Sequence, residues 1–259
     1  MRLKLRIVKE RKWHFMPRFY LKYPFSPYPL LTILGGGGII FWMRVKICGI
    51  TNVEDALLAA ELGADALGVI AVPGTPRFVT HEQVAQIRGV LPPFLPLVVV
   101  AKNAQQAQGY EKSADAFQLY DGPLIPGARC VRVVRVRDDS SLAAVAQAAA
   151  ELVSAVHLDA YHEKALGGAG VAFDWSLAVA AKASLQGKPL ILAGGLTPEN
   201  VAEAIALVQP YAVDISSGVE AFPGKKDPQK LRDFIAAAKS ASPGLVELGH
   251  PLRLREGGQ

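Results

Sequence analysis

The sequence predicts an α/β protein, a single (β/α)₈ TIM barrel with a shortened or missing fourth helix. From Met43 to about residue 240, eight short apolar runs alternate with helix-like segments. The runs are rich in Val, Ile and Leu without clean alternation, which is typical of parallel strands buried on both faces. The chain has 259 residues, 51% of them hydrophobic, which suffices for one barrel-sized core. An open doubly wound sheet is the alternative, but it gives no reason for eight regular repeats.

The predicted elements follow one another along the chain. The expected strands are 45–50, 66–72, 95–101, 116–120, 130–136, 155–161, 189–194 and 211–216. The expected helices are 52–62, 80–90, 103–113, 140–151, 174–186, 197–208 and 228–240. Asn52, Thr197 and Asp227 are expected to cap helix N-termini, and the last two precede a proline. Residues 121–128 contain two prolines and two glycines, so the fourth helix is expected to be lost or reduced to a turn.

The positive charge of the chain belongs to its first 42 residues. The whole sequence carries +5, whereas residues 1–42 hold eight Lys or Arg and one Glu, or +7. The remainder therefore carries +5 minus +7, or −2, which argues against a nucleic-acid-binding surface on the body. We expect residues 1–42 to be a disordered or over-translated extension, 43–240 the catalytic barrel and 241–259 a C-terminal tail. A targeting role for the extension is the alternative, but its apolar stretch is too short to span a bilayer and lacks a convincing cleavage site.

The two cysteines, Cys48 and Cys130, both lie inside apolar runs. Their spacing is not that of a metal site, and one pair is too few for a disulfide framework. This usage favours a reducing cytoplasm and predicts no bound metal. We expect a small-molecule phosphorylated substrate as the partner, with no nucleic acid and no membrane, and a monomer or homodimer.

Active sites of such barrels lie at the C-terminal ends of the strands, which restricts the candidates. Lys46 and Cys48 share one face of the first strand, and an inward face would bring Cys48 to the barrel mouth. A nearby cation would help the thiol act as a base, although a lone cysteine is more often a small packing residue. Asp159 ends the sixth strand, where a carboxylate is either functional, hydrated, or held in an ion pair or helix cap.

Two glycine-bearing strand ends predict a phosphate site. Gly194 and Gly195 follow the seventh strand, and Ser217 and Gly218 follow the eighth. Glycines allow backbone N–H groups to approach an anion closely, and a following helix N-terminus adds a favourable dipole. Because barrel phosphate sites commonly form after strands seven and eight, two such loops are a more specific signal than a single Gly-Gly turn.

Taken in order, these motifs resemble the phosphoribosylanthranilate isomerase family of tryptophan biosynthesis. The matching segments are 44–51 (RVKICGIT), 76–77 (PR), 158–159 (LD), 167–170 (GGAG), 173–175 (FDW), 193–196 (AGGL), 200–201 (NV) and 213–220 (VDISSGVE). The resemblance runs from Met43 to about residue 240 and does not cover the two ends of the chain.

The resemblance implies an aldose–ketose isomerisation, the Amadori rearrangement of N-(5-phosphoribosyl)anthranilate to 1-(2-carboxyphenylamino)-1-deoxyribulose 5-phosphate. By motif, Asp159 protonates the furanose ring oxygen, and Cys48, as a thiolate, removes the proton from C2′. Arg77 holds the anthranilate carboxylate, a task suited to the guanidinium fork. The phosphate is held by the backbone at Gly194, Gly195, Ser217 and Gly218. The family needs no metal or organic cofactor, since the substrate nitrogen is the electron sink.

Some positions depart from the family pattern. The third strand reads Val98-Val99-Val100-Ala101-Lys102-Asn103, and Tyr120 occupies the place of the usual histidine in Gln-Leu-His-Gly. Tyr120 can donate a hydrogen bond or stack on a ring, but it has no imidazole chemistry. These changes concern substrate contacts in one quarter of the barrel and spare both proposed proton-transfer residues.

Asp214 and His157 have alternative interpretations. Asp214 is counted among the candidate substrate-binding residues, although a buried pair with Lys46 is favoured because buried carboxylates usually need a partner. His157 lies one inward layer below Asp159 and is interpreted as a core histidine. Rival functions are indole-glycerol-phosphate synthase, ribulose-phosphate epimerase, or a non-catalytic phosphosugar-binding barrel. The epimerase uses metal-binding histidines, of which no strand-end pair is evident, and a non-catalytic barrel is expected to have lost Cys48, Asp159 or Arg77.

Overall fold

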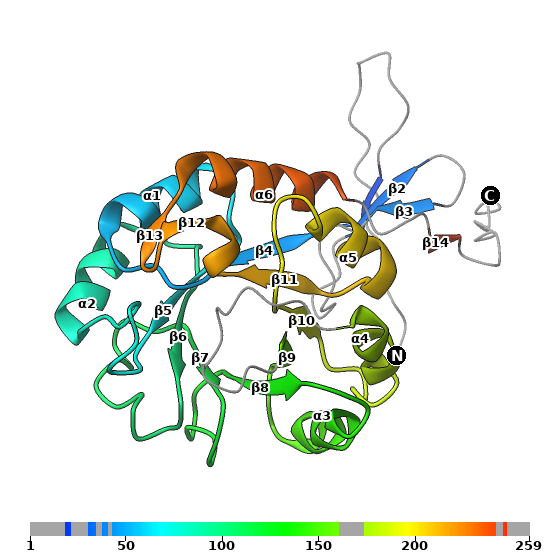
Figure 1. The fold of residues 1–259 in the computed structure, drawn as a ribbon, viewed down its shortest axis with the longest axis horizontal. Helices are drawn as coiled ribbons and strands as arrows, with labels where there is room; N and C mark the ends of the chain where they lie inside the picture. Colours follow the sequence, from blue (N-terminus) through cyan, green and yellow to red (C-terminus); the bar gives the residue numbers. More distant parts are fainter. Residues whose placement is uncertain are drawn as a thin grey trace, which may run out of the picture.

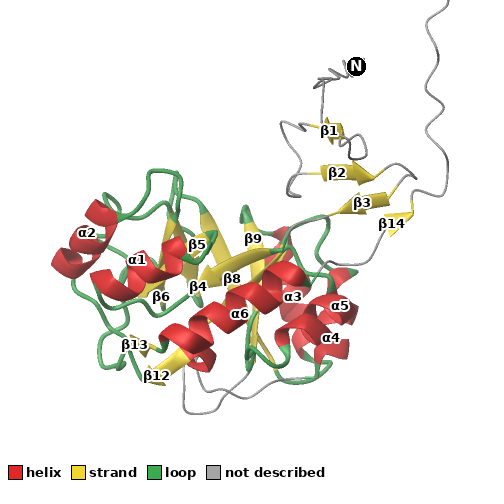
Figure 2. Ribbon diagram, turned by 90° about the horizontal axis from the view of Figure 1, so that it is seen from above, coloured by secondary structure: helices red, strands yellow, loops and turns green. Residues whose placement is uncertain are grey.

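The computed structural model describes residues 43–160 and 174–241, together with strand segments at 19–21, 31–34, 38–40 and 246–247. Parallel strands close into a barrel in the order β10-β11-β4-β5-β6-β7-β8-β9. Helices surround these strands (Figures 1 and 2). The predicted (β/α)₈ fold class is therefore confirmed.

The barrel strands coincide with the eight apolar runs. They are β4 (Arg44–Ile47), β5 (Ala66–Ile70), β6 (Leu97–Ala101), β7 (Ala116–Leu119), β8 (Cys130–Val136), β9 (Ala155–Ala160), β10 (Leu190–Leu192) and β11 (Ala212–Ile215). Nearly all of their residues are buried, because the strands face the barrel interior on one side and the helices on the other.

The helices of the described residues are α1 (Val53–Glu61), α2 (His81–Val90), α3 (Ser141–Ala150), α4 (Trp175–Lys182), α5 (Val201–Val208) and α6 (Pro228–Ser240), with a short 3₁₀ helix η1 (Ser217–Val219). Between β11 and α6 lies a small hairpin, β12 (Glu220–Phe222) and β13 (Lys225–Lys226). The hairpin lies beside α1, although the two are far apart in the sequence (Figure 1).

In the described segments on either side of β7, turns take the place of barrel helices. The segment between β7 and β8 forms turns, with Gly122 and Gly127 at positive φ, so the predicted loss of the fourth helix is confirmed. The prediction of a helix over 103–113 is wrong, since this segment also forms turns. Gly109 interrupts it at φ +89°, and the Tyr110 hydroxyl donates to the Val79 carbonyl at 2.8 Å, so tertiary anchoring replaces helical bonding.

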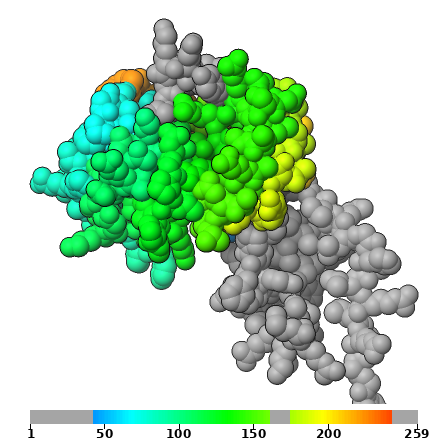
Figure 3. All heavy atoms as spheres, turned by 90° about the horizontal axis from the view of Figure 1, so that it is seen from below, coloured from blue at the N-terminus to red at the C-terminus, as the bar shows by residue number. Residues whose placement is uncertain are grey.

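The missing fourth helix leaves a hollow of about 410 Å³ beside α3. Arg132 lines this hollow, and its Nη2 donates to the Gly122 carbonyl at 2.8 Å and to Glu151 Oε2 at 2.6 Å. Figure 3 shows a face of the molecule that is formed largely by the middle of the chain, drawn in green. The lining of the hollow also includes Tyr120 and Arg135, and Arg135 is the register neighbour of Asp159 on β9.

The helix caps follow the sequence in two of three cases. Asn52 Oδ1 accepts the Asp55 N–H at 2.9 Å, and Asp227 accepts the N–H groups of residues 229 and 230. The expected cap at Thr197 is wrong, since α5 begins at Val201. The Thr197 N–H instead donates to Asn200 Oδ1 at 2.8 Å, and this turn delays the start of the helix by one turn.

The terminal segments contribute an antiparallel sheet in the order β1-β2-β3-β14. Its strands are β1 (Phe19–Leu21), β2 (Leu31–Leu34), β3 (Gly38–Ile40) and β14 (Val246–Glu247). The predictions for residues 1–42 and 241–259 otherwise concern residues outside those described. Within the described part of the chain, every helix is too short or too polar to cross a bilayer.

Candidate active site

All predicted site residues lie on one continuous arc of the barrel. Around the mouth, β9 leads to Asp159, β10 to Gly194 and Gly195, β11 to Ser217 and Gly218, β4 to Cys48, and β5 to Arg77. Cys48 and Asp159 are thus not directly opposite each other. They are three strands apart, and the two strands that carry the glycine loops lie between them.

A buried polar layer forms the floor of the site. Lys46 Nζ lies 2.7 Å from Asp214 Oδ2, and the two residues are direct neighbours in the β4–β11 register. His157 Nε2 lies 2.8 Å from the same oxygen, and its side chain is only 2% exposed. The structure therefore contains the predicted Lys46–Asp214 pair and places His157 in the barrel interior. A direct role of Asp214 in substrate binding stays a prediction.

The pairing of opposite charges keeps both Asp214 and Lys46 ionised in this buried layer. Burial alone would raise the pKa of Asp214, but the Lys46 charge and the hydrogen bond from His157 outweigh it and lower the pKa. Burial would lower the pKa of Lys46, whereas the Asp214 charge reverses this and raises it. The pair therefore remains charged, as an ammonium and a carboxylate beneath the mouth.

Asp214→Asn is expected to destabilise the fold strongly. The substitution leaves the Lys46 ammonium buried without its counter-charge, which typically costs about 3–5 kcal/mol. The measurement is the free energy of unfolding in urea. Arg88→Gln, in the more exposed Arg88–Asp115 pair, is the matched control and should cost about 1 kcal/mol or less. A loss for Asp214→Asn as small as that of the control would contradict the pairing argument.

Cys48 follows β4 directly and is 7% exposed at the barrel mouth. A Cβ at Gly68 on the neighbouring β5 would lie 2.7 Å from its Sγ and 3.0 Å from Lys46 Nζ, so this glycine leaves room for both groups. Burial raises the pKa of Cys48, and the Lys46 charge opposes that rise without cancelling it. The Lys46 charge therefore acts in the predicted direction and lowers the pKa of the thiol, but desolvation is the larger effect and the net pKa is raised.

Asp159 lies near the C-terminal end of β9 and is 6% exposed. Burial raises its pKa, His157 opposes the rise, and the Asp214 carboxylate adds to it. A raised pKa keeps a larger fraction of the carboxyl protonated, which is the form that a general acid requires.

The two glycine loops touch each other. Gly218 packs so closely on the Leu196 carbonyl that a Cβ would clash with it, and Gly194 packs in the same way on the Ala160 backbone at the end of β9. Gly194 and Gly195 have φ values of +84° and +67°, which favour glycine. Asn200 fastens the first loop, since its Nδ2 donates to the Gly195 carbonyl at 2.9 Å. The strand ends predicted to hold phosphate are therefore adjacent and half-buried.

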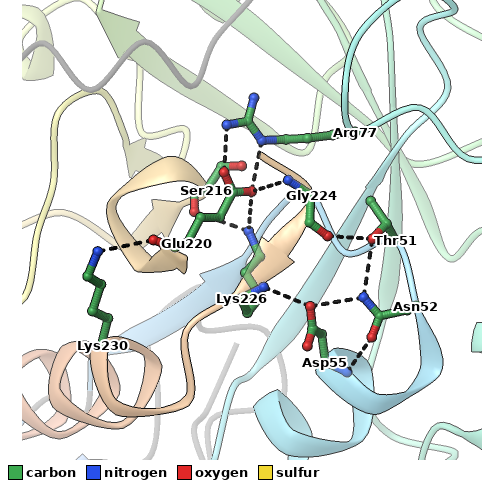
Figure 4. Close-up of polar contacts among 9 residues, drawn as sticks. All are labelled: Thr51, Asn52, Asp55, Arg77, Ser216, Glu220, Gly224, Lys226 and Lys230. Atoms are coloured by element: carbon green, nitrogen blue, oxygen red, sulfur yellow. Dashed lines mark hydrogen bonds and ion pairs between the residues drawn. The ribbon is translucent and has the colours of Figure 1, made fainter. Parts of the chain in front are cut away.

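Arg77 meets a partner that the sequence did not reveal. Its Nε and Nη2 donate to Glu220 Oε1 and Oε2 at 2.8 and 2.7 Å, a bidentate pair (Figure 4). Arg77 crosses over Gly49, where a Cβ would lie 2.8 Å from its Cδ. Glu220 belongs to the quoted segment 213–220, but only the folded hairpin shows that it turns back toward Arg77.

Tyr120 lies just beyond the end of β7, near the opposite part of the mouth. The Arg135 guanidinium carbon is 5.7 Å from the centre of its ring. Burial raises the pKa of Tyr120 well above its ordinary value, and the charges of Asp159 and Cys48 raise it further. The hydroxyl therefore stays protonated and can act as a hydrogen-bond donor.

Part of the resemblance lies outside the described residues. The segment 167–170 and Phe173 belong to the β9–α4 connection, whose described part begins at Asp174, the N-cap of α4. Among the residues that are described, no three His, Cys, Asp or Glu side chains lie close enough to hold a metal ion.

Comparison with known proteins gives the family. The family model "N-(5'phosphoribosyl)anthranilate (PRA) isomerase" matches residues 45–237. The N-(5'-phosphoribosyl)anthranilate isomerase of Geobacter sulfurreducens is 48% identical over 206 residues, which cover 76% of this chain and 98% of that protein. The chain belongs to the phosphoribosylanthranilate isomerase family.

Solved phosphoribosylanthranilate isomerases have the same fold. The Thermotoga maritima enzyme matches with a TM-score of 0.68 and 38% identity, covering 76% of this chain and 98% of that one. A phosphoribosylanthranilate isomerase in complex with reduced 1-(o-carboxyphenylamino)-1-deoxyribulose 5-phosphate matches with a TM-score of 0.65 and 36% identity, with the same coverage. The unmatched quarter of the chain corresponds to its two ends.

Proposed function

We propose that Asp159 and Cys48 are the acid and base with which this member of the family isomerises N-(5-phosphoribosyl)anthranilate. The product is 1-(2-carboxyphenylamino)-1-deoxyribulose 5-phosphate, and the pathway is tryptophan biosynthesis. The proposal is supported chiefly by the arrangement of the arc: a carboxyl of raised pKa and a thiol beside an ammonium flank two adjoining glycine loops.

The reaction begins at the furanose ring oxygen. The Asp159 carboxyl gives it a proton while the C1–O bond breaks, and the lone pair of the anthranilate nitrogen forms a C=N bond. The Cys48 thiolate then takes the proton from C2′, and the C–H electrons form the enolamine as the C=N electrons return to nitrogen. Return of a proton to C1 and loss of the enol proton give the ketone. No electrons are gained or lost overall, so the substrate nitrogen suffices as the electron sink.

The ends of the substrate have separate sites along the same arc. The loops after β10 and β11 lie between the acid and the base, so a phosphate held there places the ribose between Asp159 and Cys48. The anthranilate carboxylate lies toward β5, where Arg77 supplies a guanidinium. This placement fixes both substrate ends, which converts binding energy into orientation at the reacting carbons.

The direct test is turnover of N-(5-phosphoribosyl)anthranilate by the purified chain, with complementation of a tryptophan auxotroph that lacks this isomerase. We expect turnover and growth, both for the full chain and for a version that starts at Met43. Failure of well-expressed, folded protein in both assays would favour the alternative, a barrel that only binds a phosphorylated ligand. The presence of Cys48 and Asp159 at strand ends and of Arg77 in the loop after β5 favours the enzyme.

We also predict a cytoplasmic protein that is a monomer or homodimer and binds neither nucleic acid nor membranes. The free thiols of Cys48 and Cys130 are consistent with a reducing compartment. Light scattering of the purified full chain measures the oligomeric state, and a mass beyond that of a dimer would contradict the prediction.

A further inference from the structure

A buried ion cluster lies directly behind Arg77. The Glu220 carboxylate, which receives both bonds from Arg77, also receives Lys226 Nζ at 3.0 Å. The Lys226 side chain is 0% exposed, and its Nζ donates in addition to the Ser216 carbonyl at 3.1 Å (Figure 4). Burying an ammonium to this degree costs free energy that an exposed ion pair does not require, so the presence of Lys226 here needs an explanation.

We propose that Glu220 and Lys226 are positioning residues for carboxylate recognition: Glu220 orients the Arg77 guanidinium, and Lys226 keeps the cluster cationic. The inference rests on the proposed function, in which Arg77 holds the carboxylate of the substrate.

The geometry of the guanidinium supports the orienting role. A guanidinium has five N–H groups in one plane, and Glu220 engages two of them, on the Nε–Nη2 edge. Three N–H groups remain beyond this pair, and those on the Nη1–Nη2 edge can bind a second carboxylate bidentately. Because the Glu220 carboxylate fixes the plane of the guanidinium, the Nη1–Nη2 edge is already oriented before the substrate binds. Less conformational entropy is then lost on binding.

Charge explains the need for Lys226. Arg77 and Glu220 together are neutral, and a neutral pair attracts a second carboxylate only weakly. Lys226 brings the cluster to +1, the sign that an anionic substrate requires. Burial alone would raise the pKa of Glu220, but the hydrogen bonds from Arg77 and the charge of Lys226 lower it, so Glu220 remains ionised. Burial lowers the pKa of Lys226, and the Glu220 charge opposes this.

The surrounding backbone holds the cluster in place. The Lys226 N–H donates to Asp55 Oδ2 at 2.8 Å, and Lys225 Nζ binds the other oxygen of Asp55 at 2.7 Å, so the hairpin is fastened to α1. Lys230 Nζ donates to the Glu220 carbonyl at 3.1 Å. The bond from Lys226 to the Ser216 carbonyl links the cluster to the glycine loop after β11. The proposed carboxylate site and phosphate site therefore share one rigid support.

The test compares two substrates that differ only in the carboxylate: N-(5-phosphoribosyl)anthranilate and N-(5-phosphoribosyl)aniline. The ratio of their kcat/KM values measures carboxylate recognition. It is independent of the folded fraction, because both substrates are measured on the same preparation. Glu220→Gln should lower the ratio about 10- to 100-fold, mainly through KM, since its amide N–H groups face those of Arg77. Lys226→Met should lower the ratio in the same direction.

Double variants separate positioning from structural support. Arg77→Ala should lower the ratio at least as much as Glu220→Gln, and the two changes together should lower it no further, because both act through one guanidinium. Should Glu220→Gln fold poorly with Lys226 left as a lone buried charge, Glu220→Gln/Lys226→Met removes both charges and should still show the lowered ratio. Lys239→Met is the control, a partly exposed lysine near the end of α6 that pairs with Asp65 and not with the hairpin, and it should leave the ratio unchanged.

Two outcomes would overturn the inference. One is an equal loss for both substrates in Glu220→Gln, and the other is an additive effect with Arg77→Ala. An unchanged ratio in Arg77→Ala itself would remove Arg77 from carboxylate binding. A wild-type chain that turns over neither substrate would instead refute the proposed function, so the two failures are distinguishable.

Discussion

Purified Asp159→Asn protein is expected to lose about 10²- to 10⁴-fold in kcat, the usual range for removing a general acid or base. Asparagine has nearly the same shape and can still accept hydrogen bonds, but its amide has no acidic proton for the ring oxygen. Since the proton moves in the transition state, KM should change little by comparison. Steady-state kinetics with N-(5-phosphoribosyl)anthranilate measure both quantities.

The control for this variant is Asp233→Asn, an exposed carboxylate on α6. It should retain wild-type kcat, and both variants should unfold at a similar temperature. Removing a buried carboxylate of raised pKa costs little stability, because the site already disfavours the charged form. Near-wild-type turnover by Asp159→Asn would exclude Asp159 as the acid.

Cys48→Ala is expected to have an effect of similar size, about 10²- to 10⁴-fold in kcat. Alanine keeps the Cβ but lacks the sulfur, so it cannot take the proton from C2′. Cys130→Ala is the matched control, since Cys130 is also buried and free but lies at the start of β8. Full activity of Cys48→Ala, or an equal loss in Cys130→Ala, would contradict the assignment of the base.

The pH profile of kcat/KM should carry the signature of both groups. Activity requires protonated Asp159 and deprotonated Cys48. Between the two pKa values the fraction of enzyme in this form is constant, because the thiolate gained as pH rises is offset by the carboxylic acid lost. The rate therefore falls below the Asp159 pKa, where only the thiolate fraction still changes, and above the Cys48 pKa, where only the acid fraction still changes. Burial raises both pKa values, so both limbs should lie at higher pH than ordinary carboxyl and thiol groups would give. A profile without the alkaline limb would argue against the thiolate.

The rate of alkylation of Cys48 measures the ionisation of its thiol directly. Alkylation of Cys48 by iodoacetamide should accelerate with pH along the alkaline limb, because only the thiolate reacts. The Lys46→Met variant should move that limb to still higher pH, since the Lys46 charge is the main opposition to burial. A limb that stays in place in this variant would show that Lys46 does not act on Cys48.

Much of the barrel could be predicted from the sequence because local signals and tertiary structure agree there. The eight apolar runs became eight strands, and Asn52 and Asp227 cap helices as their residue types favour. The prediction failed where local pattern and tertiary contacts conflict. Residues 103–113 look helical, but Gly109 and the bond from Tyr110 to Val79 hold them in turns. Thr197 is of a residue type that favours an N-cap, but its N–H donates to the Asn200 side chain, and the helix begins only at Val201.

The residues alone indicate which strand of the barrel leads to the thiol, the carboxyl, the guanidinium and the glycines. Those positions follow from the alternation of strands and helices and from motifs that are local in sequence. How these groups act on one another depends on the three-dimensional fold. Desolvation by the closed barrel sets the direction of the Cys48 and Asp159 pKa shifts, and the fold of the β12–β13 hairpin brings Glu220 and Lys226 behind Arg77. Burial and contacts between distant segments have no counterpart in a local pattern, so neither effect could be predicted from the residues alone.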